Sequence, residues 1–370
     1  MLKNKRLLLF ITMCLLIFIG LVMIFSSSYI WAGYKFGDSL KYVKQQAIFV
    51  IIGFIVLRFI MKLDNDFFYK NSKYFLFASF ILLILVLIPG IGSVRNGSRS
   101  WFGIGPFGIQ PSEAMKLAMI IFASKYLNDN KNAYKKFKTI IPPLIVMGLA
   151  FFLIMLQPDF GTGVILVMSI ISVLFVSGVN MKYFYMFGML GLAGAIILIL
   201  IAPYRLDRIT SFLNPWSDPL GTGFQIIQSL YAIGPGGLLG FGFLNSRQKH
   251  FYLPEPQTDF IFSIICEEFG VFGALIVVSL FSILCYLIIK LALEQNDLFK
   301  KYVIFGLGFQ IIFQTILNLS VVIGLIPVTG VTLPFISYGG SSLLVTMISI
   351  GIILNQSKVN NWKKHHNMLK

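Results

Sequence analysis

The sequence predicts an all-α protein that crosses a membrane about ten times. Hydrophobic residues make up 57% of its 370 residues, charged residues only 12%, and the mean hydropathy is +0.85. A soluble domain carries about 25% charged residues, so this composition favours contact with lipid over contact with water. Apolar runs recur along the whole chain, and we expect one integral membrane domain over residues 1–370.

The predicted spans are apolar runs of membrane-crossing length. They lie at about 7–25, 45–61, 74–90, 113–127, 140–156, 162–178, 184–202, 260–289, 303–325 and 340–356. The first run follows Lys3, Lys5 and Arg6 and is longer than the apolar core of a cleaved signal peptide. We therefore expect it to be retained as the first spanning helix.

The basic residues fall mainly in alternate loops, together with both ends of the chain. Such a bias marks the cytoplasmic side, so we expect both termini there, including a tail from about residue 357 to 370. The same distribution accounts for the net charge of +16 through topology, and we expect no nucleic-acid partner. The three cysteines all lie in apolar runs, which predicts no disulfide framework.

One predicted outer loop is much longer than the others. It runs from about residue 203 to 259, between the seventh and eighth spans. Long connections are usually functional or disordered, but this one is rich in Phe, Leu, Tyr and Ile, which argues against disorder. We expect it to fold onto the outer face, with a short helix near 223–232.

Asp259 ends this loop, directly before the eighth apolar run. Asp is a favoured helix N-cap, and the position fits that structural role as well as a functional one. A carboxylate at the boundary between water and lipid is costly to keep there, which also favours function. Because partial burial raises the pKa of a carboxyl group, it improves the group as a base. The two interpretations are compatible.

Four more charged residues are predicted inside spans. Glu267 and Glu268 lie about two helical turns into the eighth run, and a kink near Gly270 would explain its length. Glu113 and Lys116 are three residues apart on the fourth run and can pair on one helix face. For both sets a structural ion pair is favoured over a direct role, and the edge of a cavity is the alternative.

The ninth run carries amides four residues apart, at Gln310, Gln314 and Asn318. Most such stripes form bonds between helices, worth about 1 kcal/mol or less each. A stripe that lines a polar groove is the alternative.

Cationic side chains gather in the predicted outer loops. They are Arg95, Arg99, Arg205, Arg208, Arg247, Lys249 and His250. Arg and Lys bind phosphate oxygens strongly, so a phosphate or pyrophosphate would suit this surface, with unspecific lipid headgroups as the alternative. The chain has only three histidines and lacks the HExxH and GxSxG motifs, which argues against a histidine-based hydrolase or metalloprotease.

Several short sequences are spread from about residue 90 to the end. They are RSW at 99–101, GP at 105–106, QPSE at 110–113, QPDFGT at 157–162, FQIIQS at 224–229, AIGPGG at 232–237, YLPEPQTDF at 252–260 and GLIPVTGVTLPFISYGGSS at 324–342. In order and loop position they resemble the SEDS family (shape, elongation, division and sporulation) of bacterial peptidoglycan glycosyltransferases. The residues SRQK at 246–249 are more similar to the division and sporulation branch (FtsW and SpoVE) than to the rod-elongation branch (RodA).

The resemblance implies ten helices in the bacterial cytoplasmic membrane, an extracytoplasmic active site, and lipid II as substrate. It implies that Asp259 matches the essential aspartate of the family. It also implies a class B penicillin-binding protein (a transpeptidase) as partner, together with other divisome or elongasome membrane proteins. No organic cofactor is expected. Because the leaving group is a pyrophosphate, Mg²⁺ or Mn²⁺ would suit the reaction, with Asp259 as a candidate ligand.

In the expected reaction, a sugar hydroxyl of one lipid II attacks the anomeric carbon of another, undecaprenyl pyrophosphate leaves, and Asp259 is the general base. The residues expected to bind substrate are Arg99, Arg247, Lys249, Glu255, Gln257, Thr258 and Ser337. The residues expected to be structural or to line a cavity are Glu113, Lys116, Glu267, Glu268, Gln314 and Asn318. Two other functions stay open: a flippase for lipid-linked precursors, and a non-catalytic scaffold for a penicillin-binding protein.

Overall fold

The structure is a computed structural model that describes residues 2–95, 97–103, 108–131, 137–201, 210 and 212–358. Arg205, Arg208, the pair at 105–106 and nearly all of the expected tail lie outside these residues.

A helix coincides with nearly all of each predicted span. These helices are α1 (Leu2–Phe36), α2 (Lys41–Lys62), α3 (Phe67–Leu87), α4 (Pro111–Asp129), α5 (Phe137–Met155), α6 (Phe160–Val176), α7 (Met181–Ile201), α10 (Ile261–Leu293), α11 (Leu298–Val322) and α12 (Gly340–Gln356). In the described chain, 6 helices (α1, α2, α3, α5, α10 and α11) are long and apolar enough to cross a membrane, while α6 and α12 are shorter apolar helices. The all-α membrane fold is confirmed, and the number of spans stays a prediction.

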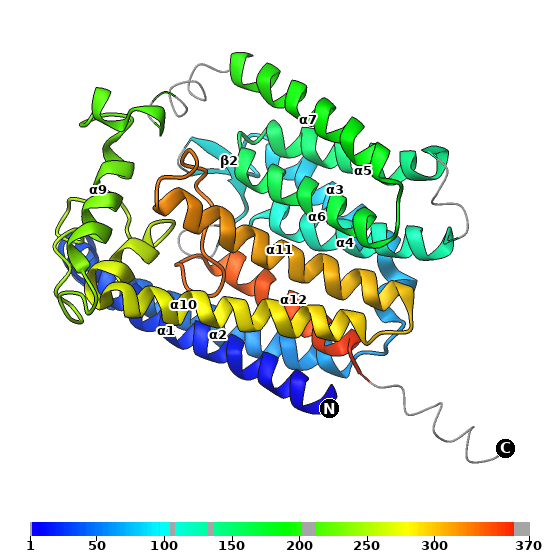
Figure 1. Cartoon of the computed structure of the whole chain (residues 1–370), viewed down its shortest axis with the longest axis horizontal. Coiled ribbons are helices and arrows are strands. Elements are labelled where there is room, and N and C mark those ends of the chain that lie inside the picture. The colour runs from blue at the N-terminus through cyan, green and yellow to red at the C-terminus, as the bar shows by residue number, and fades with distance from the viewer. Residues whose placement is uncertain are drawn as a thin grey trace.

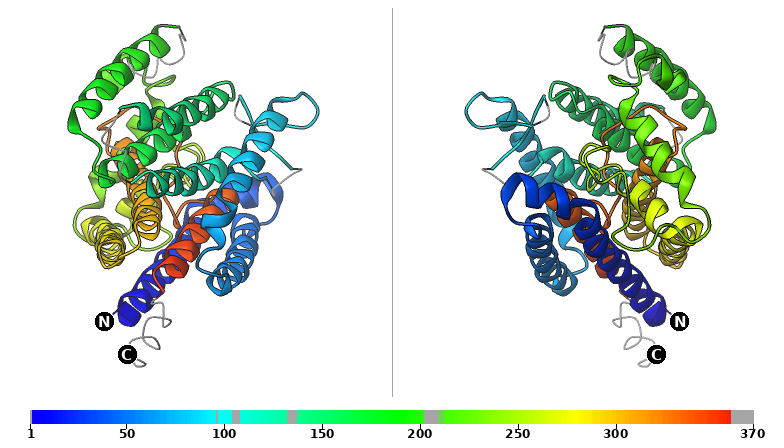
Figure 2. Two further views of the ribbon diagram at one scale, coloured as in Figure 1. Left: turned by 90° about the vertical axis from the view of Figure 1, so that its right-hand side faces the viewer. Right: turned by 90° about the vertical axis from the view of Figure 1, so that its left-hand side faces the viewer.

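The helices pack around α11 and α12, which run through the middle of the molecule (Figure 1). On one side α12 packs against α2, and α1 packs against α10; on the other side α4 and α6 pack against α11. The start of α1 and the end of α12 lie at the same end of the molecule (Figure 2), as the predicted topology requires. In α7, no side chain of described burial is buried, which suits a helix that faces lipid.

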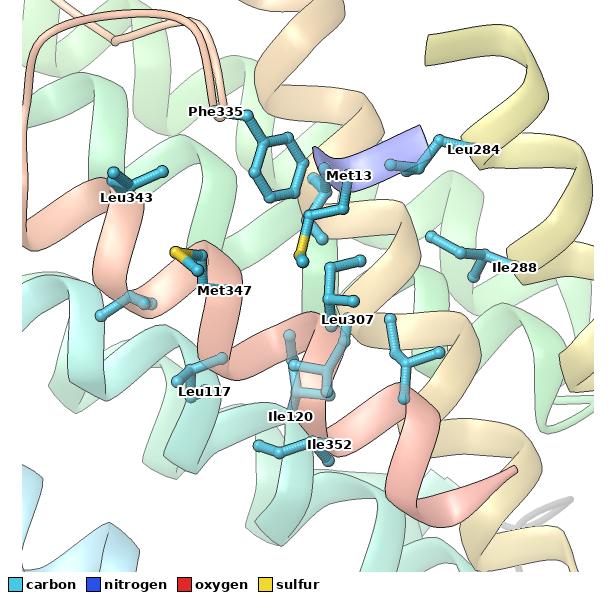
Figure 3. Close-up of a cluster of buried hydrophobic side chains, with 14 of the residues drawn as sticks. Met13, Leu117, Ile120, Leu284, Ile288, Leu307, Phe335, Leu343, Met347 and Ile352 are labelled. Atoms are coloured by element: carbon cyan, nitrogen blue, oxygen red, sulfur yellow. The ribbon is translucent and has the colours of Figure 1, made fainter. Parts of the chain in front are cut away.

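The core lies where five helices meet. Met13 of α1, Ile120 of α4 and Leu307 of α11 are fully buried, and Figure 3 shows them packed between Leu284 of α10 and Met347 of α12. Each of these side chains comes from a different helix. The long-range arrangement therefore depends on apolar packing between segments that are far apart in the sequence.

The connections predicted to lie outside the membrane contain the remaining elements. A hairpin of β1 (Ser93–Arg95) and β2 (Ser98–Trp101) follows α3 and is the one sheet found in the described residues. The long loop contains η1 (Pro215–Ser217), α9 (Phe224–Ile233) and η2 (Gly234–Gly236). The helix expected near 223–232 is therefore confirmed.

The kink predicted in the eighth span is present at Gly270, whose φ of 62° and ψ of −153° interrupt α10. The glycine-rich segment after η2 pairs with this break. The N–H of Phe241 donates to the carbonyl of Glu267 (2.9 Å), and the N–H of Val271 donates to the carbonyl of Gly237 (3.0 Å). Unpaired backbone groups are costly in lipid, so the segment stabilises the interruption.

This pairing requires close backbone approach. Gly240 has a φ of 75°, and a Cβ there would lie 2.3 Å from the backbone of Glu268. Only glycine combines this conformation with this contact. The Gly-rich run from 234 to 242 carries no phosphate-binding signature. It provides backbone hydrogen bonds to α10 at its break.

Candidate active site

A cavity of about 950 Å³ lies where the predicted outer connections converge. Its walls are the β hairpin, the start of α4, the turn between α5 and α6, the end of the long loop, and the connection between α11 and α12. Its charged and amide side chains are Arg95, Gln110, Glu113, Asp159, Gln225, Glu255, Asp259 and Gln314. Three acids beyond the predicted base, Glu113, Asp159 and Glu255, thus share the cavity with an arginine.

Asp259 lies in the wall of this cavity and is half-buried. The Thr258 hydroxyl donates to Asp259 Oδ1 (2.8 Å), and the Asn318 amide donates to the Asp259 main-chain carbonyl (2.7 Å). The N-cap position of α10 is Phe260, so Asp259 stands one residue before the place that the structural interpretation required. Its carboxylate faces the cavity, with its backbone fixed by α11.

A second cavity carboxylate, Asp159, was not singled out by the sequence analysis. It is the N-cap of α6, where Oδ1 accepts from the N–H of Thr162 (3.1 Å) and Oδ2 accepts from the Gln110 side chain (2.7 Å). Burial raises the pKa of the Asp159 carboxyl, against the opposing effect of its bonds to Thr162. The signal was present, because an Asp directly before an apolar run is a typical N-cap.

The cavity also contains a cation, and it is Arg95 rather than the expected Arg99. The Arg95 guanidinium lies 4.9 Å from the centre of the Trp101 ring. A Cβ on Gly108 would lie 2.7 Å from Arg95 Nη1, so the guanidinium packs closely against this glycine. Arg99 on β2 pairs with Val94, the neighbour of Arg95 on β1. Because neighbouring side chains of a strand point to opposite faces, the hairpin presents the two arginines on opposite faces. Arg99 does not line this cavity.

The predicted pair on α4 forms, with Lys116 Nζ 2.8 Å from Glu113 Oε1. Lys116 also donates to Gln314 Oε1 (3.2 Å), and Gln314 in turn donates to the Thr332 carbonyl (3.0 Å). Glu113 and Gln314 line the cavity, while the Lys116 side chain is fully buried behind them. This part of the amide stripe therefore both bonds between helices and borders the cavity.

The rest of the stripe is structural. Asn318 donates to the Val331 carbonyl (2.8 Å) as well as to Asp259, which ties two outer connections to α11. Gln310 is buried and does not line the cavity.

Two of the residues expected to bind substrate are buried in backbone contacts instead. Ser337 accepts from the N–H of Leu333 (2.9 Å), and the Gln257 carbonyl accepts from the N–H of Tyr338 (2.8 Å). Neither lines the cavity, whereas the expected Glu255 and Thr258 do. Ser337 and Gln257 thus join the connection between α11 and α12 to the end of the long loop, and their expected role in substrate binding stays a prediction.

The turn at Tyr338 is held by α2, which the sequence analysis had not connected with the site. The Gln46 amide donates to the Ser337 carbonyl (3.1 Å) and accepts from the N–H of Gly339 (3.2 Å). The Tyr338 hydroxyl donates to Gln45 Oε1 (2.6 Å). Burial raises the pKa of Tyr338 to about 12.

The expected phosphate-binding residues Arg247 and Lys249 lie away from the cavity. Lys249 Nζ is 2.7 Å from Glu268 Oε1, and both side chains are fully buried. The main-chain N–H of Arg247 donates to Glu267 Oε1 (2.8 Å). Both glutamates thus have partners inside the protein, and the cation that pairs with Glu268 comes from the long loop.

No group of three or more His, Cys, Asp or Glu side chains in the described chain is arranged to hold a metal ion. These residues therefore do not fit a metal centre made by the protein alone. Mg²⁺ is often held by one or two carboxylates together with substrate phosphates. A role for Mg²⁺ or Mn²⁺ would depend on such substrate oxygens.

Comparison with known proteins matches nearly the whole chain. Residues 6–361 fit the FtsW/RodA/SpoVE family, described as "Cell cycle protein". The chain is 51% identical over 360 residues to "Stage V sporulation protein E" of Bacillus subtilis (strain 168), covering 97% of this chain and 98% of that protein. It is 39% identical over 342 residues to "Probable peptidoglycan glycosyltransferase FtsW" of Saccharophagus degradans, covering 91% and 88%.

Solved structures are similar to this chain over nearly its whole length. One chain in "Structural coordination of polymerization and crosslinking by a peptidoglycan synthase complex" has a TM-score of 0.78 at 28% identity, covering 94% of this chain and 96% of that chain. The Thermus thermophilus rod shape determining protein RodA has a TM-score of 0.69 at 25% identity, covering 94% and 95%.

Proposed function

The chain belongs to the FtsW/RodA/SpoVE family, and we propose that its outer cavity is where it builds glycan strands. The protein is a multi-pass membrane peptidoglycan glycosyltransferase. The observation that carries the proposal is the position of Asp259, a carboxylate in the wall of a cavity that also presents Arg95. The substrate proposed for this cavity is lipid II.

In the proposed step, the acceptor hydroxyl gives its proton to the Asp259 carboxylate while its oxygen bonds to the anomeric carbon of the donor. The bond from that carbon to the pyrophosphate oxygen breaks, and undecaprenyl pyrophosphate takes the electron pair. General base catalysis of this kind contributes about 10²–10⁴-fold. The Thr258 hydroxyl and the Asn318 bond to the backbone orient the base.

Arg95 is the proposed partner of the leaving pyrophosphate. A guanidinium pairs well with phosphate oxygens, and a fixed cation stabilises charge that develops as the bond breaks. Its contact with the Trp101 ring helps to orient it. Apolar side chains of Ile165, Leu317 and Ile326 line another part of the cavity and suit the first units of a polyprenyl chain.

The proposed orientation places the cavity outside the cell and both termini in the cytoplasm, following the distribution of basic residues. The proposed partner is a class B penicillin-binding protein, within the division, sporulation or elongation machinery. The similar chain solved in a peptidoglycan synthase complex supports such an assembly. Mg²⁺ or Mn²⁺ is proposed only as an ion that would accompany the pyrophosphate.

The test is polymerisation of purified lipid II by the purified protein, with and without the penicillin-binding protein and with no other polymerase present. Asp259→Asn is expected to abolish long glycan strands. Asp38→Asn is the matched control, because Asp38 lies in an exposed outer turn and does not line the cavity. Normal polymerisation by Asp259→Asn would contradict the assignment of the base.

The same preparation in liposomes addresses the two other functions. Movement of labelled lipid II across the bilayer without polymer would support a flippase. The scaffold is favoured if the purified protein makes no polymer and cells that carry Asp259→Asn in this protein still grow.

A further inference from the structure

The two glutamates beside the break in α10 bind the beginning of a segment that ends at Asp259. This segment, residues 246–259, is called the strap. Glu267 accepts from the Ser246 hydroxyl and from the main-chain N–H of Arg247 (2.8 Å). Glu268 pairs with Lys249 (2.7 Å). The two carboxylates therefore fix the start of the strap to α10.

The same glutamate connects the strap to α1. The Ser26 hydroxyl donates to both oxygens of Glu268, at 2.6 and 2.7 Å, and Lys249 Nζ lies 5.0 Å from the centre of the Tyr29 ring. α1 and α10 also pack along each other (Figure 1). Lys249, Glu267 and Glu268 are 2%, 1% and 0% exposed, and none of them lines the cavity. Substrate in the cavity cannot reach them.

The strap is held at its other end as well. The Gln257 carbonyl accepts from the N–H of Tyr338, and the Asp259 carbonyl accepts from Asn318. Between these ends, Phe251 and Glu255 have φ values of 69° and 43°. Residues other than glycine rarely adopt such φ values, which persist only where the surrounding structure enforces them. The strained conformation of the strap therefore depends on its anchors.

We propose that Lys249 and Glu268, together with Glu267, are positioning residues for polymerisation: they hold the start of the strap so that its end presents the Asp259 carboxylate to the cavity. This inference rests on the proposed function. It replaces the expected role of Lys249 in binding pyrophosphate, because the ammonium group is buried and paired. Loss of the anchor should disturb the base and leave the substrate-binding wall at Arg95 intact.

The test compares Lys249→Met with the double variant Lys249→Met/Glu268→Gln. The single variant leaves the Glu268 carboxylate buried without its counter-ion, so the start of the strap should shift. Turnover is expected to fall roughly 10- to 100-fold, since small displacements of a catalytic group have effects of this size. KM for lipid II should change by less than about twofold, because no binding contact is removed.

The double variant removes both charges and keeps side chains of similar volume, which buried ion pairs often tolerate. The amide oxygen introduced by Glu268→Gln can still accept from the Ser26 hydroxyl and from the N–H of Ser246, so part of the anchor remains. The double variant is therefore expected to fold and to recover most of the turnover. A lysine that binds pyrophosphate directly would not be rescued by Glu268→Gln. Lys44→Met is the matched control, since Lys44 is in an exposed outer ion pair, and it should polymerise like the wild type.

Three results would overturn the proposal: unchanged turnover in Lys249→Met, an effect mainly on KM, or a double variant that fails to recover or to fold. Thermal unfolding in detergent is measured for every variant. Failure of the proposed function is recognised separately, because the wild-type protein would then make no polymer under any of these conditions.

Discussion

Two buried ion pairs among the described residues differ in what surrounds them. Glu113 and Lys116 are one turn apart on α4, and Glu113 borders the cavity. Lys249 and Glu268 join the strap to α10, and neither of them lines the cavity. Their N–O distances are nearly equal, 2.8 and 2.7 Å. The same type of Lys–Glu pair thus supports the cavity wall at α4 and anchors the strap at α10.

A third pair provides the reference. Lys44 and Asp38 lie 2.9 Å apart near the turn between α1 and α2, with 61% and 42% of their side chains exposed. Solvent and salt screen such a pair, so its contribution to stability is small. The three pairs together separate the effect of burial from the effect of access to the cavity.

The largest effect on stability is expected for Lys116→Met. The change leaves the Glu113 carboxylate buried without its cation, and breaking a buried pair costs about 3–5 kcal/mol. Unfolding of the purified protein in detergent should occur at clearly lower temperature, and Lys44→Met should not change it. If the two lysine variants unfold alike, burial is not what distinguishes the pairs.

Arg95→Ala should act on substrate binding rather than on folding. Arg95 lines the cavity and Arg99 does not, so the first substitution should raise KM for lipid II about tenfold, which corresponds to about 1.4 kcal/mol. Turnover should fall as well, because Arg95 is also proposed to stabilise the charge that develops on the pyrophosphate. Arg99→Ala on the same hairpin is the control and should leave KM near the wild-type value. A larger effect from Arg99→Ala would reverse the assignment of the cavity cation.

Tyr338→Phe tests the link between the cavity wall and α2. It removes the bond to Gln45 but keeps the ring against Tyr42, so a loss of about 1 kcal/mol is expected.

The pH dependence has a definite sign. Burial raises the Tyr338 pKa from 10.0 to about 12, so the folded protein holds this proton more tightly than the unfolded chain. The contribution is complete below pH 10 and is lost as the pH rises towards 12. Unfolding measured over this range should show a weaker pH dependence in Tyr338→Phe than in the wild type.

The smallest effect is expected for Asp38→Asn. The hydrogen bond from Lys44 and then the N–H of Leu40 hold the pKa of the Asp38 carboxyl below its usual value. The unfolded chain therefore binds this proton more readily, and the stabilisation is present above the usual pKa and lost as the pH falls through the folded value. Stability curves of the variant and the wild type should converge at acidic pH, and polymerisation at neutral pH should be unchanged.

The sequence alone determined the membrane fold, the positions of the helices and the break at Gly270. It also identified Asp259 as a candidate functional residue. These follow from the length of apolar runs, from glycine and from the cost of charge near lipid, which are all local properties. The Glu113–Lys116 pair was predictable for the same reason, since its spacing within one helix fixes the contact.

Tertiary structure alone decided which polar residues share the cavity. Arg95 lines the cavity and Arg99 does not, and Asp159 lies in the same cavity as Asp259. Lys249, which was expected to bind phosphate, forms an ion pair with Glu268 instead. These outcomes depend on contacts between segments far apart in the chain, made by packing α1, α10 and α11 together. Composition and spacing indicate that a charge needs a partner, but only the folded arrangement determines whether that partner is another side chain or the substrate.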